Sequence, residues 1–409
     1  MTYILYPNVY LVKGKKCGCL YDFNQSKLYS LNQALTDLLD KINHGHFEAA
    51  DATQENKDML TQLIGLHLIR KADTAICNDI KELAVKDFHC KFAWIEITNK
   101  CNLRCIHCYN ESCVQADKIM SLEDYKLVLD SLINLGVRKI QIIGGEPFFN
   151  QDNLRKMLDY TIGKVDFIEI FTNGTLIRES WFEFLQKNHI HVALSVYSYD
   201  HEMHDKVTQC NGAWERTNRT INCLKAYHIP YRVCNVLLKG IELGENHGNP
   251  YTLHINRDVV RMSGRANFGL LSDELIEKRL ITKDSFRKPI TKAFCSKIVS
   301  GHNCFSDRLY ISADLKIYPC VMERRFDHGS VTKERGIVLN DKILHFNKDF
   351  VEGCRDCEYR YCCFDCRPNS LSDDIYAKPW YCTYNPEKGE WMDKKRFIEV
   401  LHHTWDRNN

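Results

Sequence analysis

The chain has 409 residues, of which 44% are hydrophobic and 26% are charged, and its formal net charge is +2. This length allows two or three hydrophobic cores, and the near-neutral charge disfavours a nucleic-acid partner. No apolar stretch approaches the roughly 20 residues of a membrane span, and the first residues, MTYILYPNVYLV, lack the features of a secretory signal. We therefore expect a cytoplasmic protein without membrane contact, in which cysteines are reduced thiols or metal ligands.

Residues 1–85 combine a small antiparallel sheet with helices. Apolar and polar residues alternate from Asn8 to Asn32, and apolar residues recur at helical spacing from Leu31 to Asn43 and from Glu55 to Asp73. Three strands and about three helices predict a winged-helix module. DNA binding is one role for such a module, but no concentrated basic helix is present. The polar segment from Lys71 to Lys91 is the predicted linker to the next domain.

This first module resembles the peptide-recognition element, or RRE, of enzymes that modify ribosomally made peptides. The resemblance implies that an extended leader peptide adds as a strand to an exposed edge of the sheet. A precursor peptide is therefore the expected partner, and we favour it over DNA.

Three cysteines stand close together in the segment TNKCNLRCIHCYN, residues 98–110. Cys101, Cys105 and Cys108 can hold an iron–sulfur cube by three corners, which leaves the fourth iron for a ligand. About 40 residues later an apolar, β-branched run ends at Gly144, Gly145, Glu146 and Pro147, in the pattern of a strand that opens into a binding loop. The glycines let backbone groups approach a ligand, and Glu146 supplies acceptors for a cationic amine.

These two motifs resemble those of the radical S-adenosylmethionine (SAM) superfamily. The resemblance implies that SAM chelates the open iron, and that an electron from the reduced cluster splits SAM to give a 5'-deoxyadenosyl radical that takes hydrogen from unactivated carbon. An external electron donor such as flavodoxin or ferredoxin is implied as a partner. His107 falls at the aromatic position that packs near the adenine.

Further strands follow the second motif. They are expected at Asp166–Ile177, His191–Asp200, Arg232–Leu238 and Arg257–Ala266, with helical patterns between the earlier ones. This alternation predicts an α/β fold with a partial (β/α)6 TIM-like barrel over residues 86–270 and chemistry at the carboxyl ends of the strands. Thr172, Asn173 and Ser195 resemble cofactor-facing strand ends of the family. Thr208 stands where some members carry an arginine that meets the cofactor carboxylate.

Nine cysteines crowd residues 271–409, namely Cys295, Cys304, Cys320, Cys354, Cys357, Cys362, Cys363, Cys366 and Cys382. Zinc is one metal that such a set of cysteines could bind, since paired CxxC units are common zinc ligands. The pattern also resembles a SPASM domain, which carries auxiliary iron–sulfur clusters in peptide- and protein-modifying members of the superfamily. In two departures from that pattern, only two residues separate Cys363 from Cys366, and Leu315 replaces an expected glycine.

The SPASM resemblance implies two auxiliary clusters, and therefore three 4Fe–4S clusters in total. Cys295, Cys304, Cys320 and Cys366 would hold the nearer cluster. Cys354, Cys357, Cys363 and Cys382 would hold the farther one, with Cys362 as an exchangeable candidate. If Cys295 is not a ligand, the nearer cluster has an open iron that can bind a substrate thiolate.

The expected protein is a radical SAM maturase of a ribosomally synthesised peptide. We expect it to form an intramolecular thioether between a cysteine sulfur and a carbon atom of the peptide. Carbon–carbon cyclophane formation, epimerisation, a sulfatase-type protein maturase and a non-catalytic, zinc-holding peptide chaperone remain as alternatives.

Overall fold

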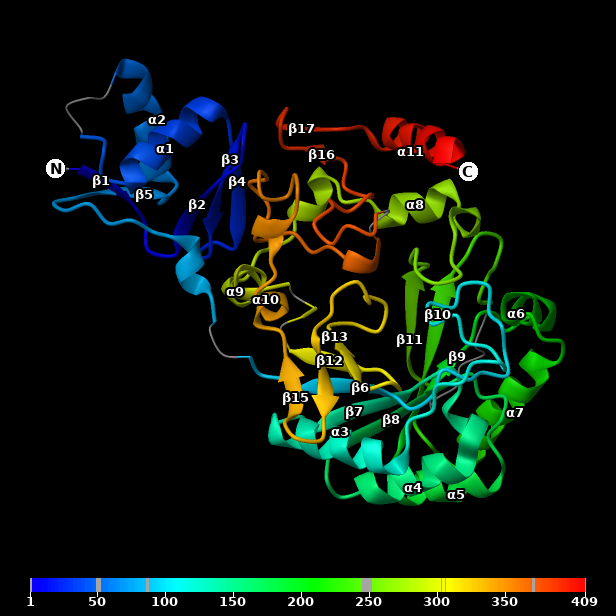
Figure 1. Ribbon diagram of the computed structural model, residues 1–409. Coiled ribbons are helices and arrows are strands. Elements are labelled where there is room, and N and C mark those ends of the chain that lie inside the picture. The colour runs from blue at the N-terminus through cyan, green and yellow to red at the C-terminus, as the bar shows by residue number, and fades with distance from the viewer. Residues whose placement is uncertain are drawn as a thin grey trace.

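The computed structural model describes residues 2–48, 53–85, 88–244, 252–302, 304–305, 307–369 and 372–408. Figure 1 shows a small N-terminal lobe, coloured blue, beside a larger body formed by the rest of the chain.

The N-terminal lobe is built on a three-stranded antiparallel sheet. Its strands are β2 (Val9–Lys13), β3 (Gly18–Asp22) and β4 (Lys27–Leu31), and they are followed by the helices α1 (Gln33–Asn43) and α2 (Gln54–Gly65). The expected third helix is replaced by a strand. The chain reverses at His67, where φ is 56°, and Ile69–Ala72 forms β5, which pairs antiparallel with β1 (Thr2–Leu5). The 3-10 turn η2 (Ile80–Leu83) lies in the predicted linker.

The larger body contains a ten-stranded sheet. Six neighbouring parallel strands follow one another in chain order: β6 (Phe92–Glu96), β7 (Lys139–Ile143), β8 (Phe167–Thr172), β9 (His191–Ser195), β10 (Tyr231–Leu237) and β11 (Thr252–Val259). The crossovers between them contain α3 (Leu122–Asn134), η3 (Pro147–Asn150), α4 (Gln151–Thr161), α5 (Ser180–Lys187), α6 (His201–Thr208) and α7 (Ala213–Ala226). Apolar side chains of these strands and helices form the main core. The expected α/β fold with an open, partial barrel is confirmed.

Two features of this sheet differ from expectation. The sixth strand, Thr252–Val259, begins and ends earlier than the predicted Arg257–Ala266 and overlaps it only at residues 257–259, because Val233–Leu237 pairs with Ile255–Val259 and the chain then turns away at Gly264. The other end of the sheet is extended by segments from the last third of the chain. These are β12 (Arg308–Ile311), which pairs parallel with β6, and the antiparallel strands β13 (Lys316–Tyr318), β14 (Gly329–Thr332) and β15 (Gly336–Leu339).

Apart from α11 (Lys394–Asn408), which has 15 residues, the remaining elements of the last third are short. They are η4 (Phe268–Leu270), α8 (Asp273–Arg279), η5 (Lys283–Phe286), α9 (Lys292–Ser300), α10 (Asp341–Leu344), η6 (Lys348–Phe350), η7 (Arg367–Asn369), β16 (Tyr384–Asn385), β17 (Glu390–Trp391) and α11 (Lys394–Asn408). Leu315, in the turn from β12 to β13, has φ of 64°. This left-handed backbone explains why a glycine is the residue expected at that position.

The N-terminal sheet packs on the cysteine-rich segment. The backbone N–H of Lys15 donates to the carbonyl of Asp356 at 2.8 Å, and the Tyr21 hydroxyl donates to the carbonyl of Glu358 at 2.9 Å. Buried apolar side chains from both regions share one core. The N-terminal lobe is therefore held against the segment that carries the last group of cysteines.

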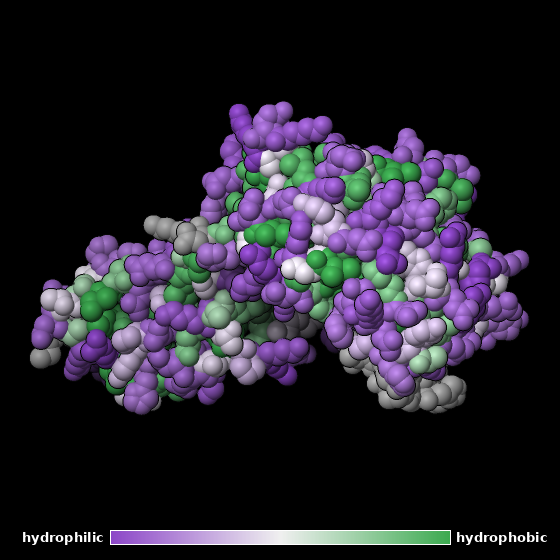
Figure 2. All heavy atoms as spheres, turned by 90° about the horizontal axis from the view of Figure 1, so that it is seen from below, coloured by the Kyte–Doolittle hydropathy of each residue, from purple (hydrophilic) through white to green (hydrophobic). Residues whose placement is uncertain are grey.

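The surface seen in Figure 2 is mainly hydrophilic, with small separate hydrophobic areas. Among the described residues, no helix has both the length and the apolar character needed to span a membrane. The sequence ELGENHGNP, residues 242–250, also predicts a surface loop near the active face, but its residues 245–250 lie outside the described ranges.

Candidate active site

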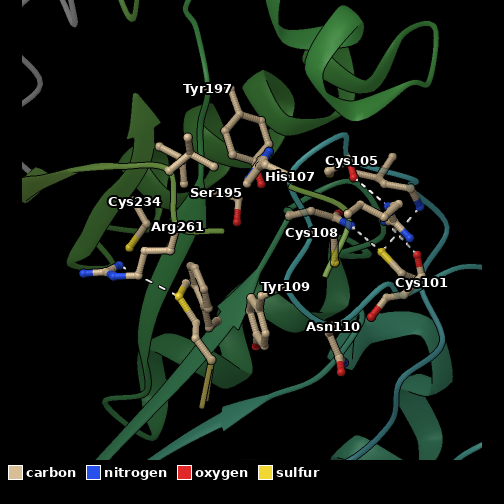
Figure 3. A pocket seen from close by; sticks show the side chains of 18 of the residues that line it. Cys101, Cys105, His107, Cys108, Tyr109, Asn110, Ser195, Tyr197, Cys234 and Arg261 are labelled. Atoms are coloured by element: carbon tan, nitrogen blue, oxygen red, sulfur yellow. Dashed lines mark hydrogen bonds between the residues drawn. The ribbon is translucent and has the colours of Figure 1, made fainter. Parts of the chain in front are cut away.

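A cavity of about 250 Å³ opens at the carboxyl ends of the parallel strands. Its wall is formed by the cysteine loop after β6, by residues at the ends of β7 to β11, and by the segment that follows β11 (Figure 3). The side chains labelled in Figure 3 are Cys101, Cys105, His107, Cys108, Tyr109, Asn110, Ser195, Tyr197, Cys234 and Arg261. Barrels of this class carry their chemistry at this end of the strands.

Cys101, Cys105 and Cys108 lie on one side of the cavity, as Figure 3 shows. The sulfur of Cys101 accepts hydrogen bonds from the N–H of Leu103 at 3.4 Å and from the side-chain amide of Asn173 at 3.7 Å. Burial raises the pKa of Cys105 to about 12, and the neighbouring Cys108 thiol adds to the shift. Neutral thiols are therefore favoured without metal, so binding of iron by thiolates would release protons.

The end of α6 supports this cysteine loop through its backbone. The N–H groups of Arg104 and Ile106 donate to the carbonyl oxygens of Thr208 and Val207 at 3.1 and 3.0 Å. Thr208 is fully buried, and its hydroxyl donates to the carbonyl of Asp205 at 3.2 Å. Thr208 is thus placed beneath the cysteine loop, away from the cavity wall.

Arg265 holds the same loop from the other side. Its Nε donates to the carbonyl of Cys105 at 2.9 Å, and its Nη2 donates to the carbonyl of Ser112 at 3.1 Å. A Cβ at the preceding Gly264, where φ is 59°, would lie 2.4 Å from the carbonyl oxygen of Cys108. The segment after β11 therefore packs directly on the cysteine loop.

Gly144 and Gly145 lie very close to the protein's own backbone. A Cβ at Gly145 would lie 2.1 Å from the carbonyl oxygen of Lys100, and a Cβ at Gly144 would lie 2.5 Å from that of Thr98. The N–H of Gly145 donates to the Thr98 carbonyl at 2.7 Å. The two glycines line the cavity, but their lack of a side chain is required by contact with the chain that leads into Cys101.

Glu146 lies behind the cavity wall and is fully buried. Its carboxylate accepts hydrogen bonds from the Thr172 hydroxyl at 2.7 Å, from the N–H of Asn173 at 2.8 Å and from the N–H of Phe148 at 3.0 Å. Burial raises its pKa to about 7, although these three donors oppose the shift. Glu146 therefore fixes the end of β8, and Pro147 begins η3 behind it.

Replacing Glu146 with glutamine is expected to lower the free energy of unfolding by about 1–3 kcal/mol. The new side-chain NH2 group would face a backbone N–H or the Thr172 hydroxyl, and a buried donor would lose its acceptor. Chemical denaturation of the metal-free chain measures the effect. Glu183→Gln, at an exposed position on α5, is the matched control and should change little; equal values for both variants would contradict the assigned role.

His107 and Tyr197 form an aromatic corner of the cavity. Their rings meet edge to face with centroids 4.7 Å apart. Burial lowers the pKa of His107 to about 4, and Arg265 lowers it further. Within the described part of the chain, Nδ1 of His107 is buried without a hydrogen-bond partner. A neutral ring with an unpaired nitrogen beside Ser195 suits an uncharged heterocycle such as adenine.

Sequence reasoning missed a buried polar network behind the cavity. Arg324 donates to the Asn110 side chain at 2.8 Å and to the Glu96 carboxylate at 3.2 Å, and the Tyr310 hydroxyl also donates to Glu96. Only Asn110 of these four reaches the cavity wall. Tyr310 and Arg324 come from the last third of the chain, so no motif of the barrel indicates them.

The cysteines of the last third fall into separate groups. Cys304, Cys320 and Cys366 form the group next to the cavity: burial raises the pKa of Cys304 to about 12, and the Cys320 and Cys366 thiols raise it further. Cys366 also accepts a hydrogen bond from Nε of Arg261, a residue of the cavity wall, at 3.0 Å.

A second group consists of Cys354, Cys357, Cys363 and Cys382. Burial raises the pKa of Cys354 to about 12, with further contributions from Cys382 and Cys363, and Cys354 and Cys363 in turn raise that of Cys357. The buried ammonium of Lys348 donates to the Cys363 sulfur at 3.4 Å.

Cys295 lies in a third environment, with Cys19 of β3 and Cys362. Burial alone raises the pKa of Cys295 to about 12, and Cys295 raises the pKa of both Cys19 and Cys362. The Cys362 thiol donates to the carbonyl of Tyr359 at 3.3 Å. The structure therefore separates Cys295 from Cys304, Cys320 and Cys366, to which the sequence had joined it.

The donor sets fit iron–sulfur clusters in their chemistry, because each of the sets near the cavity consists of thiols only. Across the described residues, no three His, Cys, Asp or Glu side chains converge on a point where they could hold one metal ion. The Cys101, Cys105 and Cys108 set offers three ligands beside a cavity, which fits a cube with one corner left open.

Comparison with known proteins identifies residues 95–247 as a match to the radical SAM superfamily. The antilisterial bacteriocin subtilosin biosynthesis protein AlbA of Bacillus subtilis is 35% identical over 179 residues, which are 43% of this chain and 40% of AlbA. A probable GTP 3',8-cyclase of Methanocella arvoryzae is 26% identical over 252 residues, 56% of this chain and 80% of the relative. The chain thus spans about two fifths of AlbA's length.

Solved structures with a similar fold match most of the chain. Streptococcus suis SuiB bound to its precursor peptide SuiA matches with a TM-score of 0.55 at 14% identity, covering 91% of this chain and 98% of SuiB. The protein anSMEcpe with bound AdoMet matches with a TM-score of 0.53 at 19% identity, covering 76% of this chain and 99% of that protein. At these identities the likeness concerns the fold.

Proposed function

We propose that this chain, a radical SAM enzyme, matures a ribosomally synthesised peptide by joining a cysteine sulfur of the peptide to one of its carbon atoms. The observation that carries the proposal is the group of three thiols, Cys304, Cys320 and Cys366, beside the cavity. With Cys295 apart from them, a cluster on this group has one corner without a protein thiolate, and a substrate sulfur is the ligand suited to it.

SAM on a cluster held by Cys101, Cys105 and Cys108 would supply a 5'-deoxyadenosyl radical. A cluster on Cys304, Cys320 and Cys366, called the Cys304 group below, would supply a free iron and an electron acceptor. The protein's own part is positioning. Arg265 and the end of α6 fix the cysteine loop, and Glu146 fixes the end of β8.

The proposed reaction removes two hydrogens from the peptide. One carbon loses a hydrogen atom to the radical, which becomes 5'-deoxyadenosine. The cysteine thiol loses a proton, the carbon–sulfur bond forms, and one electron leaves the peptide.

A peptide substrate is supported by two comparisons and by the N-terminal lobe. AlbA is named for biosynthesis of a bacteriocin, and SuiB is described with its precursor peptide bound. β4 lies at an edge of its three-stranded sheet, and among the described residues no further strand pairs with it; an edge strand is the element to which an extended peptide can add. Leu28 of β4 faces a cleft of about 470 Å³ that also contains Phe286, Ile290, Phe294 and Phe364. An apolar cleft beside a strand edge suits an extended leader peptide with apolar side chains.

Replacing Leu28 with glutamate is expected to weaken binding of the precursor's leader by at least about tenfold, which corresponds to about 1.4 kcal/mol. The carboxylate would lose solvation in the apolar cleft when the peptide covers it. Fluorescence anisotropy with a labelled leader peptide measures the affinity. Val338→Glu, an apolar-to-acidic change at a 38% exposed position on β15, is the control; equal affinities of the two variants would contradict a leader site at β4.

The reaction itself is tested with reduced holoenzyme, SAM and precursor under anaerobic conditions. The product is expected to be lighter by two hydrogens and to have one thiol fewer available for alkylation, with 5'-deoxyadenosine formed. The same mass with every thiol still alkylated would indicate a carbon–carbon link. An unchanged mass with a residue of inverted configuration would indicate epimerisation. Either result would overturn the thioether proposal.

A further inference from the structure

Arg261 connects the cavity to the Cys304 group. Its Nε donates to the Cys366 sulfur at 3.0 Å, its Nη1 lies 3.9 Å from the sulfur of Met322, and both Arg261 and Met322 line the cavity. A single layer of side chains, Arg261 and Met322, thus lies between the cavity and a thiol of this group.

Arg261 is held in this orientation by an ion-pair network. Its Nη2 donates to the Asp258 carboxylate, which also pairs with Nη1 of Arg279 at 3.1 Å. The side chain of Arg261 is 23% exposed and that of Arg279 is 17% exposed. Because Asp258 fixes the far side of the guanidinium, Nε remains directed at Cys366.

We propose that Arg261 is a positioning residue that raises the reduction potential of an iron–sulfur cluster on Cys304, Cys320 and Cys366. Reduction adds negative charge to a cluster, and a cationic N–H donor on a ligand sulfur stabilises that charge. A higher potential favours acceptance of the electron that leaves the substrate. The inference rests on the cluster in the proposed function, but it does not depend on which bond the enzyme forms.

The test is a redox titration of the reconstituted holoenzyme in the absence of peptide, in which electron paramagnetic resonance monitors the clusters. Arg261→Gln is expected to shift the midpoint of one auxiliary cluster downward by about 59 mV, the equivalent of a tenfold change for a one-electron couple. The second auxiliary cluster should keep its midpoint potential and serves as an internal reference. Its proposed ligands are Cys354, Cys357, Cys363 and Cys382. The SAM-binding cluster is recognised by the change of its spectrum when SAM is added.

Two further variants separate the hydrogen bond from the charge. Arg261→Lys keeps the charge and should lower the midpoint potential less than Arg261→Gln does. Arg279→Gln removes the other cation on Asp258 without removing the Nε–Cys366 bond, and should give a smaller shift than Arg261→Gln. Unchanged midpoints in Arg261→Gln, equal shifts of both auxiliary clusters, or loss of iron from both Arg261 variants would overturn the inference. A weakened affinity for SAM with no shift would assign Arg261 to the cofactor instead.

Because the midpoint is measured without peptide, its result is independent of the product. A shifted midpoint with a carbon–carbon product would retain the role of Arg261 and reject the thioether. A thioether product with an unshifted midpoint would do the reverse.

Discussion

Replacing Cys105 with alanine is expected to lower the rate of 5'-deoxyadenosine formation by at least about 10³-fold, as for other residues that act as part of one catalytic unit. Cys105 is the middle member of the triplet. A four-iron cluster held by Cys101 and Cys108 alone would have two irons without a protein thiolate. The loop itself should persist, because Arg265 contacts the carbonyl of Cys105 rather than its side chain. Chromatography of the nucleoside product and iron analysis measure the effect.

Cys113→Ala is the matched control for this experiment. Cys113 follows in the same loop, and its carbonyl accepts from the N–H of Cys101 at 3.1 Å, a bond that does not need the thiol. This variant should retain iron and SAM cleavage. Full SAM cleavage by Cys105→Ala would remove the triplet from the mechanism and with it the assignment of the cavity.

The parallel part of the fold could be predicted because its signals are local. Apolar runs such as Lys139–Ile143 and His191–Ser195 end at polar or glycine-containing turns, and helical patterns lie between them. The extension of the sheet by β12 to β15 could not be predicted in the same way. β12 has four residues, and its pairing partner β6 lies more than 200 positions earlier in the chain. Only tertiary packing determines that pair.

Most of the residues predicted to surround the first cluster line one cavity, but the contacts of some of them differ from those expected. The spacing of Cys101, Cys105 and Cys108 indicates a shared ligand, because three thiols on one short loop must lie close together. The sequence predicts that Gly145 and Glu146 face a ligand, whereas their closest contacts are with Lys100 and with the end of β8. A glycine reveals that something approaches the backbone closely, but its sequence context does not say what approaches.

Cys362 and Cys363 illustrate the same limit, since spacing alone could not choose between them. The structure gives them different neighbours: Cys362 lies beside Cys19 and Tyr21, whereas Cys363 lies beside Cys382 and receives the Lys348 ammonium. A buried cation next to a thiol favours its thiolate, which is the form that binds iron.

Cys363→Ala is therefore expected to bind less iron than the unchanged protein, because the proposed cluster on Cys354, Cys357, Cys363 and Cys382 would lose one of its four ligands. Cys362→Ala should bind as much iron as the unchanged protein, because its side chain belongs to the core shared with the N-terminal sheet. Iron and sulfide analysis after anaerobic reconstitution measures both variants, with circular dichroism to check that each is folded. Equal losses in the two variants would contradict this assignment. Loss from Cys362→Ala alone would exchange the two ligands, and the Lys348 ammonium would then face a thiol that binds no iron, with the buried Asp365 carboxylate as its anionic partner.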